Sequence, residues 1–487
     1  MVTRLVKAPR IDFASLRREL ELPTRFPLAA QREADVAAAH VAAELTAHAA
    51  SAATADRTDI PFVTIDPATS RDLDQALSLH RRAGGFRVFY AIADVTGFVP
   101  VGGELEGETW RRGETVYLPD GKVPLHPVSL SEGAASLLPG ETRPAVLWTV
   151  DLDSEGMTSA VRLERAVVRS RAKLDYDGVQ TAADAGQLAE PIALLPQVGA
   201  LLLARALDRG AINLPIPEQE LEPDHDGWRL KLRAALPAEA WNAQISLLTG
   251  MCAADIMLAG HIGLLRTMPS PRPEAVTALR AVAAALGLDW VDGAPVGRVL
   301  AAVDPASPRG AAFVDQAAEL MRGASYTTVD GDLPQQTGHG GVGAPYAHVT
   351  APLRRLADRY ATEVCLSLVH GREVPDWVRA ALPQLPDVME KSGRRASAAE
   401  RGALDLAEAV LLQDRVGEEF SAAVLDVAPA RSSANGAQRP AMVTIAIDEP
   451  PVRARCVGSA TLGQRVRVRL TQADPGSRTV LFELVST

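Results

Sequence analysis

Three aspartates in one short segment have the residue type and spacing of a metal site. Asp66 follows the apolar run Pro61 to Ile65, and Asp72 and Asp74 flank Leu73. In an extended segment, side chains two positions apart point to the same face, so Asp72 and Asp74 can converge while Leu73 turns into the core. The intervening loop is long enough to bring Asp66 beside them. Such carboxylate oxygens suit Mg²⁺ or Mn²⁺, ions that acidify bound water and clamp the oxygens of a phosphodiester.

Two other interpretations of these aspartates were weighed. Asp72 and Asp74 look like the start of an EF-hand loop, but the twelfth position from Asp72 is Ala83 instead of a bidentate glutamate, which excludes that site. The acids can also cap turns or face solvent. Taken alone, the aspartates support this second interpretation as well as they support a metal site.

A second candidate segment, Tyr346 to Asp358, contains paired arginines at the start of an expected helix. Arginine suits phosphate because its planar fork donates two parallel hydrogen bonds and stays charged. Arg354, Arg355 or both could therefore hold a scissile phosphate. The alternative is an ion pair within the helix, either Arg354 with Asp358 at i, i+4 or Arg355 with Asp358 at i, i+3.

Composition and cysteine usage bound the class of protein. At 487 residues, with 47% hydrophobic and 23% charged residues, the chain can bury a large core in two to four domains, which excludes disordered and collagen-like classes. Cys252, Cys365 and Cys456 lie far apart, so neither a disulfide framework nor a zinc ribbon is expected. Met1 to Phe13 has no apolar run long enough for a signal peptide or membrane span. We therefore expect a cytoplasmic monomer without membrane contact.

The charge is unevenly distributed along the chain. A formal net charge of −10 argues against binding nucleic acid by bulk attraction. Residues 423–487, however, carry eight arginines against five acids, a net charge of +3. Arg465, Arg467 and Arg469 alternate with apolar residues and share one face of an expected strand. Such a face can track the backbone of single-stranded nucleic acid, although solvated strand faces are common.

Hydrophobic periodicity predicts a multidomain α+β protein. Residues 12–55 are expected to be helical and compatible with a helix-turn-helix-like module. Strands follow at 60–65, 76–79, 86–93 and 145–153, with Gly84 and Gly85 as a hairpin turn. Beyond about Lys173 the pattern is mainly helical, at 190–208, 238–265, 273–287, 311–323, 353–371 and 397–415. Five short strands at 420–427, 441–447, 452–456, 464–471 and 479–485 predict an OB-type β-barrel.

Taken together, these segments resemble the ribonuclease II and ribonuclease R family. The similarity covers roughly residues 57–370, and its motifs occur in the family's order: Phe62 to Pro67, Asp72 to Asp74, Ala91 to Val95, Arg112-Gly113, Val116 to Asp120, Lys173 to Tyr176 and Tyr346 to Asp358. With the periodicity, the resemblance predicts an RNB-type catalytic domain at 57–415 and an RNA-binding OB fold at 416–487, preceded by a helical module at 1–56 where the family usually has two cold-shock OB domains. It also implies processive 3′-to-5′ hydrolysis of single-stranded RNA or 3′ overhangs to nucleoside 5′-monophosphates with Mg²⁺.

The resemblance also assigns roles to individual residues. Asp66, Asp72 and Asp74 match the family's active-site aspartates, and Asp74 is the one most tightly tied to chemistry. Arg354 matches the arginine that engages the phosphate, while Tyr176 and Tyr117 match nucleotide contacts. Further candidate substrate contacts in the same segments are Arg355, Tyr346 and His348.

Two neutral residues depart from the family pattern. Gln75 stands at the usual fourth aspartate, where its amide oxygen can still ligate an ion or hold a water, and Gln244 stands where a glutamate is expected. These departures favour an alternative, an RNA-binding pseudoenzyme or regulatory protein of the same fold. A metal-dependent phosphodiesterase for small nucleotides is a third hypothesis, which leaves the basic tail unexplained.

Overall fold

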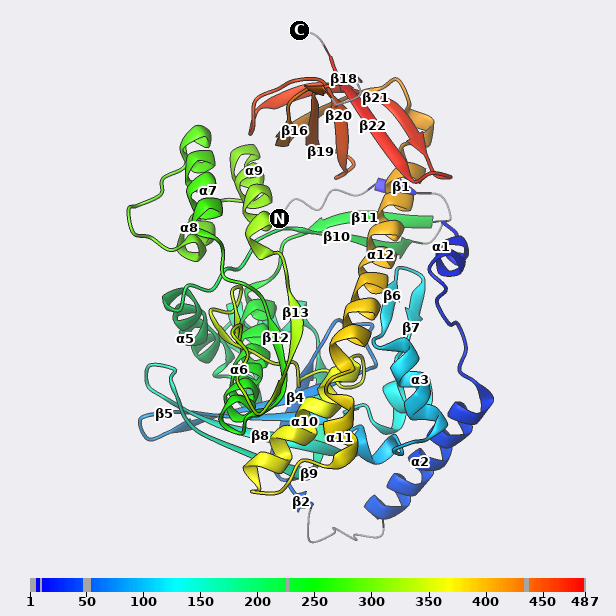
Figure 1. The fold of residues 1–487 in the computed structure, drawn as a ribbon, viewed down its shortest axis with the longest axis vertical. Helices are drawn as coiled ribbons and strands as arrows, with labels where there is room; N and C mark the ends of the chain where they lie inside the picture. Colours follow the sequence, from blue (N-terminus) through cyan, green and yellow to red (C-terminus); the bar gives the residue numbers. More distant parts are fainter. Residues whose placement is uncertain (1–5, 9–10, 47–53, 225–226, 433–437, 486–487) are drawn as a thin grey trace.

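The computed structural model describes residues 6–8, 11–46, 54–224, 227–432 and 438–485 (Figure 1). Its centre is a six-stranded sheet in the order β2-β9-β3-β4-β5-β8. β8 also pairs with β9, so the sheet curls back on itself. The strands of this sheet are β2 (Ala55–Asp56), β3 (Phe62–Ile65), β4 (Gln75–Arg82), β5 (Gly85–Ala93), β8 (Thr142–Asp153) and β9 (Thr158–Leu174).

β4 and β5 form the hairpin that the sequence predicts. Arg82 lies opposite Gly85, and Gly84 makes the turn with φ +77°, a conformation that side chains with a Cβ atom rarely adopt. Burial alternates along the first half of β5, whereas Ala91 and its neighbours are buried on both faces. The tip of the hairpin is therefore exposed, and its other end, where β4 begins at Gln75, lies inside the protein.

Two hydrophobic clusters lie against the sheet. The larger one packs Tyr90 and Trp148 against α6 (Pro237–Ala259) and α10 (Leu356–Val369). The other combines Ala91 and Leu147 with apolar residues of helix α2 (Leu28–Thr46) and of the 130–138 segment. The remaining helices of this region are α3 (Glu104–Arg112), α4 (Tyr176–Asp184), α5 (Leu195–Asp208) and α11 (Asp376–Ala381).

One stretch passes a simple test for a membrane span. Residues 190–208, which include α5, are long and apolar enough by composition to cross a bilayer. A single such stretch is weak evidence because core helices pass the same test, and α5 buries Leu195, Val198 and Leu202. The absence of membrane contact therefore stays a prediction.

The N-terminal segment contains the expected helices, α1 (Ala14–Glu19) and α2 (Leu28–Thr46), and an unexpected strand, β1 (Val6–Ala8). β1 pairs with a strand of the central region, while α1 packs on α12 (Leu385–Leu412) and α2 on α3. Buried Arg112 holds the connection between the helices, because its guanidinium donates to the carbonyls of Pro23 and Arg25. The segment is thus bound along the central region, and the domain boundary at residue 56 and the helix-turn-helix-like arrangement stay predictions.

The expectation of a mainly helical region beyond Lys173 was partly wrong. The predicted helix over 238–265 ends at Ala259, because His261 has φ +54° and the apolar residues that follow form a strand. A short apolar run is compatible with either structure, so periodicity alone could not separate them. The unpredicted strands are β10 (Glu218–Asp224), β11 (Gly227–Arg233), β12 (Ile262–Thr267), β13 (Ser325–Asp330), β14 (Gly338–His339) and β15 (Ala344–Pro345).

A separate cluster of short helices lies beside the barrel (Figure 1). Its helices are α7 (Pro273–Leu286), α8 (Val296–Ala302) and α9 (Pro308–Ala317). The predicted barrel is confirmed: its strands close in the order β16-β19-β20-β22-β21. They are β16 (Glu419–Ala428), β19 (Met442–Ile447), β20 (Arg453–Val457), β21 (Arg465–Asp474) and β22 (Thr479–Leu484), with β17 (Arg431–Ser432) and β18 (Gln438–Arg439) in the long loop.

The 28-residue helix α12 connects the two parts of the molecule. It contacts the strands around the sheet at one end and β21 and β22 of the barrel at the other (Figure 1). The boundary at residue 415 falls just after this helix and stays a prediction.

Candidate active site

The loop from β3 to β4 carries the predicted aspartates and is anchored by Leu73. Leu73 is fully buried, its N–H donates to Ser136 Oγ at 3.0 Å, and its carbonyl accepts from Leu137 N–H at 3.0 Å. Because side chains alternate along an extended segment, burying Leu73 turns Asp72 and Asp74 away from that core. The side chains of Asp72 and Asp74 are only 8% and 5% exposed.

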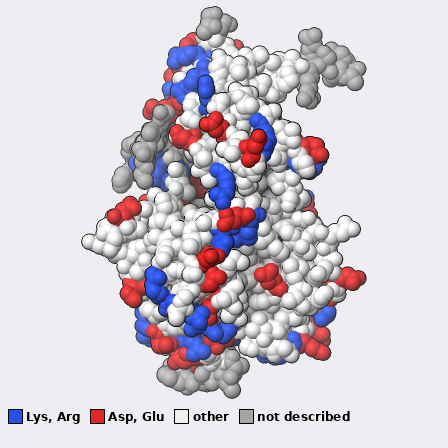
Figure 2. Space-filling model, turned by 90° about the vertical axis from the view of Figure 1, so that its left-hand side faces the viewer, with Lys and Arg blue, Asp and Glu red and all other residues white. Residues whose placement is uncertain are grey.

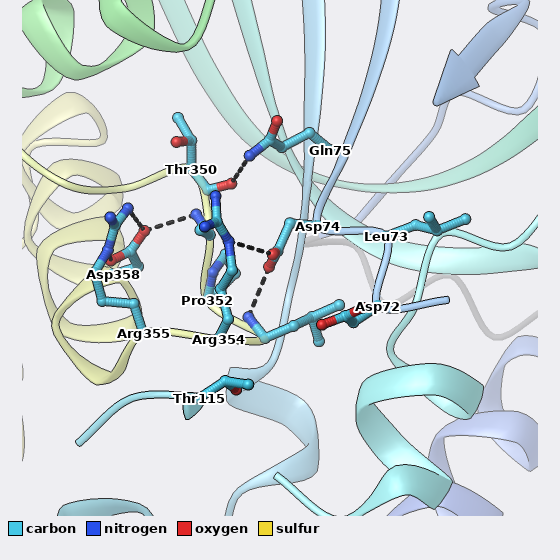
Figure 3. Close-up of polar contacts among 12 residues, drawn as sticks. Asp72, Leu73, Asp74, Gln75, Thr115, Thr350, Pro352, Arg354, Arg355 and Asp358 are labelled. Carbon is cyan, nitrogen blue, oxygen red and sulfur yellow. Dashed lines mark hydrogen bonds and ion pairs between the residues drawn. The ribbon is translucent and has the colours of Figure 1, made fainter. Parts of the chain in front are cut away.

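Asp74 is joined directly to the arginine segment (Figure 3). Its Oδ1 accepts from the backbone N–H of Leu353 at 2.7 Å, and its Oδ2 lies 3.4 Å from Arg354 Nε. The Arg354 side chain is 47% exposed and the Asp74 side chain 5%. The structure therefore brings together a buried carboxylate and a guanidinium that reaches solvent.

The two arginines have different partners. Arg355 donates to both carboxylate oxygens of Asp358, at 2.5 and 2.8 Å, and Asp358 is fully buried. Asp358 also accepts from Ala351 N–H at 2.6 Å, so it fixes the loop that leads into α10 (Figure 3). The intrahelical pair considered for this segment exists for Arg355, whereas Arg354 pairs with Asp74 instead.

A short hairpin holds Asp72. Its strands are β6 (Val116–Leu118) and β7 (Gly121–Val123), in which Tyr117 lies opposite Lys122. Tyr117 Oη donates to Asp72 Oδ2 at 2.9 Å, and Lys122 Nζ lies 2.8 Å from Asp72 Oδ1. Sequence reasoning found Tyr117 and missed Lys122. The Pro119-Asp120 turn was the available signal, because a two-residue turn pairs the positions on either side of it.

Gln75 bonds at both ends of its amide. Its Nε2 donates to the carbonyl of Thr350 at 2.6 Å (Figure 3). Its Oε1 accepts from Tyr90 Oη at 2.7 Å. Tyr90 Oη also lies 2.7 Å from Ser246 Oγ on helix α6. Gln244, two residues before Ser246 on the same helix, is 9% exposed. Gln75 thereby ties the first residue of β4 to the loop before Arg354, a positioning contact that its type alone did not indicate.

The aromatic candidates differ in accessibility. Tyr176 is partly buried at the start of α4, and its Oη accepts from Asn242 Nδ2 at 3.4 Å. Tyr346 is 9% exposed, and its ring lies edge-on to His348. His348 Nδ1 lies 2.6 Å from Tyr326 Oη, and burial lowers the pKa of His348 well below its usual value. Tyr346 and His348 therefore lie in a packed aromatic group, while Tyr176 retains an accessible side.

The electrostatics of the loop suit a cation. Burial raises the pKa of Asp74 to about 8, opposed by Arg354 and the Leu353 N–H, and raises that of Asp66 to about 6, opposed mainly by Lys173. Repulsion from Asp72 adds to both shifts. A divalent ion stabilises the ionised form of carboxylates that are otherwise costly to ionise next to one another. Carboxylate oxygens are also the ligands that Mg²⁺ prefers. The donor set thus fits Mg²⁺ chemically, although in the described residues no three His, Cys, Asp or Glu side chains stand close enough to form a metal cage.

Two sequence profiles match this chain. The profile of the RNB domain matches residues 55–369, more than half of the chain, and that of the RNase II-type exonuclease C-terminal S1 domain matches residues 418–485. The chain belongs to the RNB domain family. Its RNB domain contains the loop, the hairpin and the arginine segment described above, and its S1 domain is the closed barrel.

Curated relatives of this RNB-family chain include two ribonucleases R. That of Aquifex aeolicus is 26% identical over 472 residues, covering 87% of this chain and 63% of the relative. That of Escherichia coli is 28% identical over 403 residues, covering 78% of this chain and 49% of the relative. An exosome complex exonuclease homolog of Arabidopsis thaliana is 28% identical, with 40% of its length covered. The chain therefore spans between 40% and 63% of the length of these relatives.

Two solved structures share the fold of this chain. Mycoplasma genitalium RNase R in its apo form superposes with a TM-score of 0.79 at 20% identity, covering 97% of this chain and 77% of that one. Yeast Ssd1, described as a pseudonuclease, superposes with a TM-score of 0.67 at 17% identity, covering 86% and 53%. At such identities the likeness shows the fold alone.

In the S1 domain of this RNB-family chain, each predicted RNA-binding arginine has an acidic neighbour. Arg465 donates to Asp448 at 3.0 Å, and Arg467 and Arg469 donate to Glu419 at 3.3 and 2.9 Å. All three side chains remain exposed by 44–58%. Figure 2 likewise shows basic and acidic side chains interspersed over one face of the molecule. The barrel face is therefore less positive than its arginine count implies.

Proposed function

We propose that this chain is a 3′-to-5′ exoribonuclease that hydrolyses RNA processively to nucleoside 5′-monophosphates with Mg²⁺, for which Mn²⁺ can substitute. The observation that carries the proposal is the contact of Asp74 with Leu353 and Arg354. It pairs a buried carboxylate with a half-exposed guanidinium, which supports a role for Arg354 in binding an incoming phosphate.

The roles of the residues follow from these contacts. Asp66, Asp72 and Asp74 would hold the ion, with Gln75 fixing the start of β4 behind them. When bound, Mg²⁺ acidifies a water and stabilises charge on the phosphate. Arg354 binds the scissile phosphate through its fork, and Leu353 N–H keeps Asp74 oriented. Tyr117 and Tyr176 would contact the terminal nucleotides.

We propose single-stranded RNA or a 3′ overhang as the substrate. The exposed guanidiniums on β21 support backbone binding that does not depend on sequence. Mycoplasma genitalium RNase R, which shares the fold, has been solved with double-stranded RNA and with ribose-methylated single-stranded RNA. A cytoplasmic monomer is part of the same proposal.

An RNA-binding pseudoenzyme is the second candidate. Gln75 and Gln244 are neutral where the family pattern has acidic residues, and the fold is shared with the pseudonuclease Ssd1. Under this alternative, RNA binds with a salt-dependent affinity and is not cut at any Mg²⁺ or Mn²⁺ concentration.

A digest of 5′-labelled RNA tests the proposal. The protein should convert a single strand and a duplex with a 3′ overhang to mononucleotides and a short labelled end product. Asp74→Asn should abolish cleavage while RNA binding persists, and exposed Asp292→Asn is the matched control. Equal cleavage by wild type and Asp74→Asn would remove the catalytic assignment, and intact RNA with tight binding would establish the pseudoenzyme.

A further inference from the structure

Each aspartate of the loop has a cation of this chain beside it. Arg354 lies against Asp74, and Lys173, whose Nζ donates to two carbonyls of the loop, lowers the cost of ionising Asp66. Lys122 contacts Asp72 directly at 2.8 Å. Each aspartate that could hold an ion is thus offset by a basic side chain of the same chain, whereas a strong site for divalent ions carries an excess of negative charge.

Lys122 makes the most direct of these contacts. Its Nζ bridges Asp72 Oδ1 and Glu132 Oε1, at 2.8 and 2.9 Å, and its side chain is 20% exposed. Tyr117, the cross-strand neighbour of Lys122, takes the other oxygen of Asp72. Both carboxylate oxygens of Asp72 are therefore held by one hairpin, and the ammonium group already contacts Oδ1, an oxygen that would otherwise be available to a divalent ion.

We propose that Lys122 is a positioning residue whose ammonium group is a built-in counter-cation for Asp72 and competes with a divalent ion for that carboxylate. The inference rests on the proposed function, since it concerns the metal of the same site. On this inference the site binds a divalent ion weakly, because the Asp72 carboxylate would become available to the ion only when the lysine is displaced.

The physical reason is charge repulsion at short range. A lysine and a divalent ion on one carboxylate repel each other by several times the thermal energy, even with solvent screening. Glu132 keeps the lysine in place, so moving it toward solvent also breaks a second ion pair. Removing the ammonium group should therefore tighten metal binding, while removing a purely structural lysine should leave it unchanged.

The test measures Mn²⁺ binding to the full chain without RNA, by electron paramagnetic resonance of the free ion. Lys122→Met should lower the Mn²⁺ dissociation constant by at least about tenfold, whereas Lys122→Arg should keep it within about twofold. Lys231→Met, on the distant strand β11, is the control and should match wild type. Lys122→Gln repeats the measurement with a polar neutral side chain, and thermal unfolding checks that each variant folds.

The outcomes separate the inference from the proposed function. Tighter Mn²⁺ binding in Lys122→Met and Lys122→Gln supports the inference whether or not wild type digests RNA. An unchanged dissociation constant in folded variants, or no detectable Mn²⁺ binding by any of them, overturns it. Digestion of RNA by wild type together with that result would leave the exoribonuclease proposal standing and show that Lys122 only fastens the hairpin.

Discussion

The backbone N–H of Leu353 donates to Asp74 Oδ1 at 2.7 Å and joins two segments that are 279 residues apart in the chain. Arg354 follows directly, so the same short turn that orients the carboxylate also places the guanidinium. Asp358 braces the turn from behind through the N–H of Ala351. The carboxylate of Asp74 and the guanidinium of Arg354 are therefore positioned by the same contact between two segments.

The two adjacent arginines should respond differently to substitution. Arg354→Ala should lower the single-turnover cleavage rate by about 100-fold, because a phosphate-binding guanidinium is lost from a preorganised site. Its effect on stability should stay under about 1 kcal/mol, because the side chain is 47% exposed and Asp74 keeps the Leu353 N–H and, with a pKa of about 8, can become protonated. Arg355→Ala should instead destabilise the fold by about 3–5 kcal/mol, since it leaves buried Asp358 without its ion-pair partner.

Rapid-quench kinetics and urea unfolding measure the two effects on the same proteins. Arg354→Lys is the matched variant, and it should recover part of the rate because it keeps the charge without the fork. A stability loss from Arg354→Ala as large as that from Arg355→Ala would contradict the division of roles.

Replacing Arg465, Arg467 and Arg469 by alanine should weaken RNA binding and flatten its salt dependence more than it lowers the maximal rate. The slope of log affinity against log salt should change by less than the loss of three full phosphate contacts would produce. The reason is that Asp448 and Glu419 already neutralise part of this charge. Filter binding at several salt concentrations gives the slope.

Glu419→Gln is the informative companion to that triple variant. It removes the acid shared by Arg467 and Arg469, so RNA affinity should rise and the salt slope should steepen. Lower cleavage with unchanged binding in the triple variant would mean that the barrel arginines do not contact RNA.

Glu408 should make stability depend on pH. This residue of α12 is 6% exposed and accepts from Gln219 Nε2 at 2.9 Å and from Arg453 N–H at 3.4 Å. Burial raises the pKa of Glu408 from 4.5 to about 7, so the folded state prefers the protonated form. Its contribution is complete below about pH 4.5 and is lost as the pH rises toward 7, at a cost of about 3 kcal/mol at most.

Glu408→Gln keeps a neutral hydrogen-bonding side chain and should remove the pH-dependent contribution of Glu408 to the free energy of unfolding. The difference in unfolding free energy between variant and wild type should grow from pH 5 to pH 8 in favour of the glutamine. Chemical denaturation of both proteins across this range measures it, with exposed Glu390→Gln as the control. A difference that does not vary with pH would show that Glu408 is ionised throughout.

The sequence predicted those parts of the fold whose signals are local. The alternation around Leu73, the Gly84 turn and the five strands of the barrel all appear where periodicity and turn residues place them. It did not separate β12 from the helix before it, because a short apolar run fits both and only the backbone at His261 decides.

The site was predicted as a set of residues and only partly as a geometry. Asp74 and Arg354 were both named as site residues, but their contact was not predicted, because it depends on tertiary packing that no local pattern contains. Lys122 and the bonds of Gln75 to Thr350 and Tyr90 were missed for the same reason, since each joins separate strands or loops. For Arg354 and Arg355, spacing alone allowed several pairings, and burial of Asp358 decided between them.

The length of helix α12 bears on how long a bound RNA strand must be. Its 28 residues, at about 1.5 Å per residue, make it roughly 42 Å long, and it contacts both the strands around the sheet and the barrel. On the proposed function, an RNA strand that contacts both the barrel and Asp74 must cover the distance between them, and helix α12 helps to set that distance. The minimum length of RNA that can bind both the barrel and the active site then depends on this helix and not on the chemistry of cleavage.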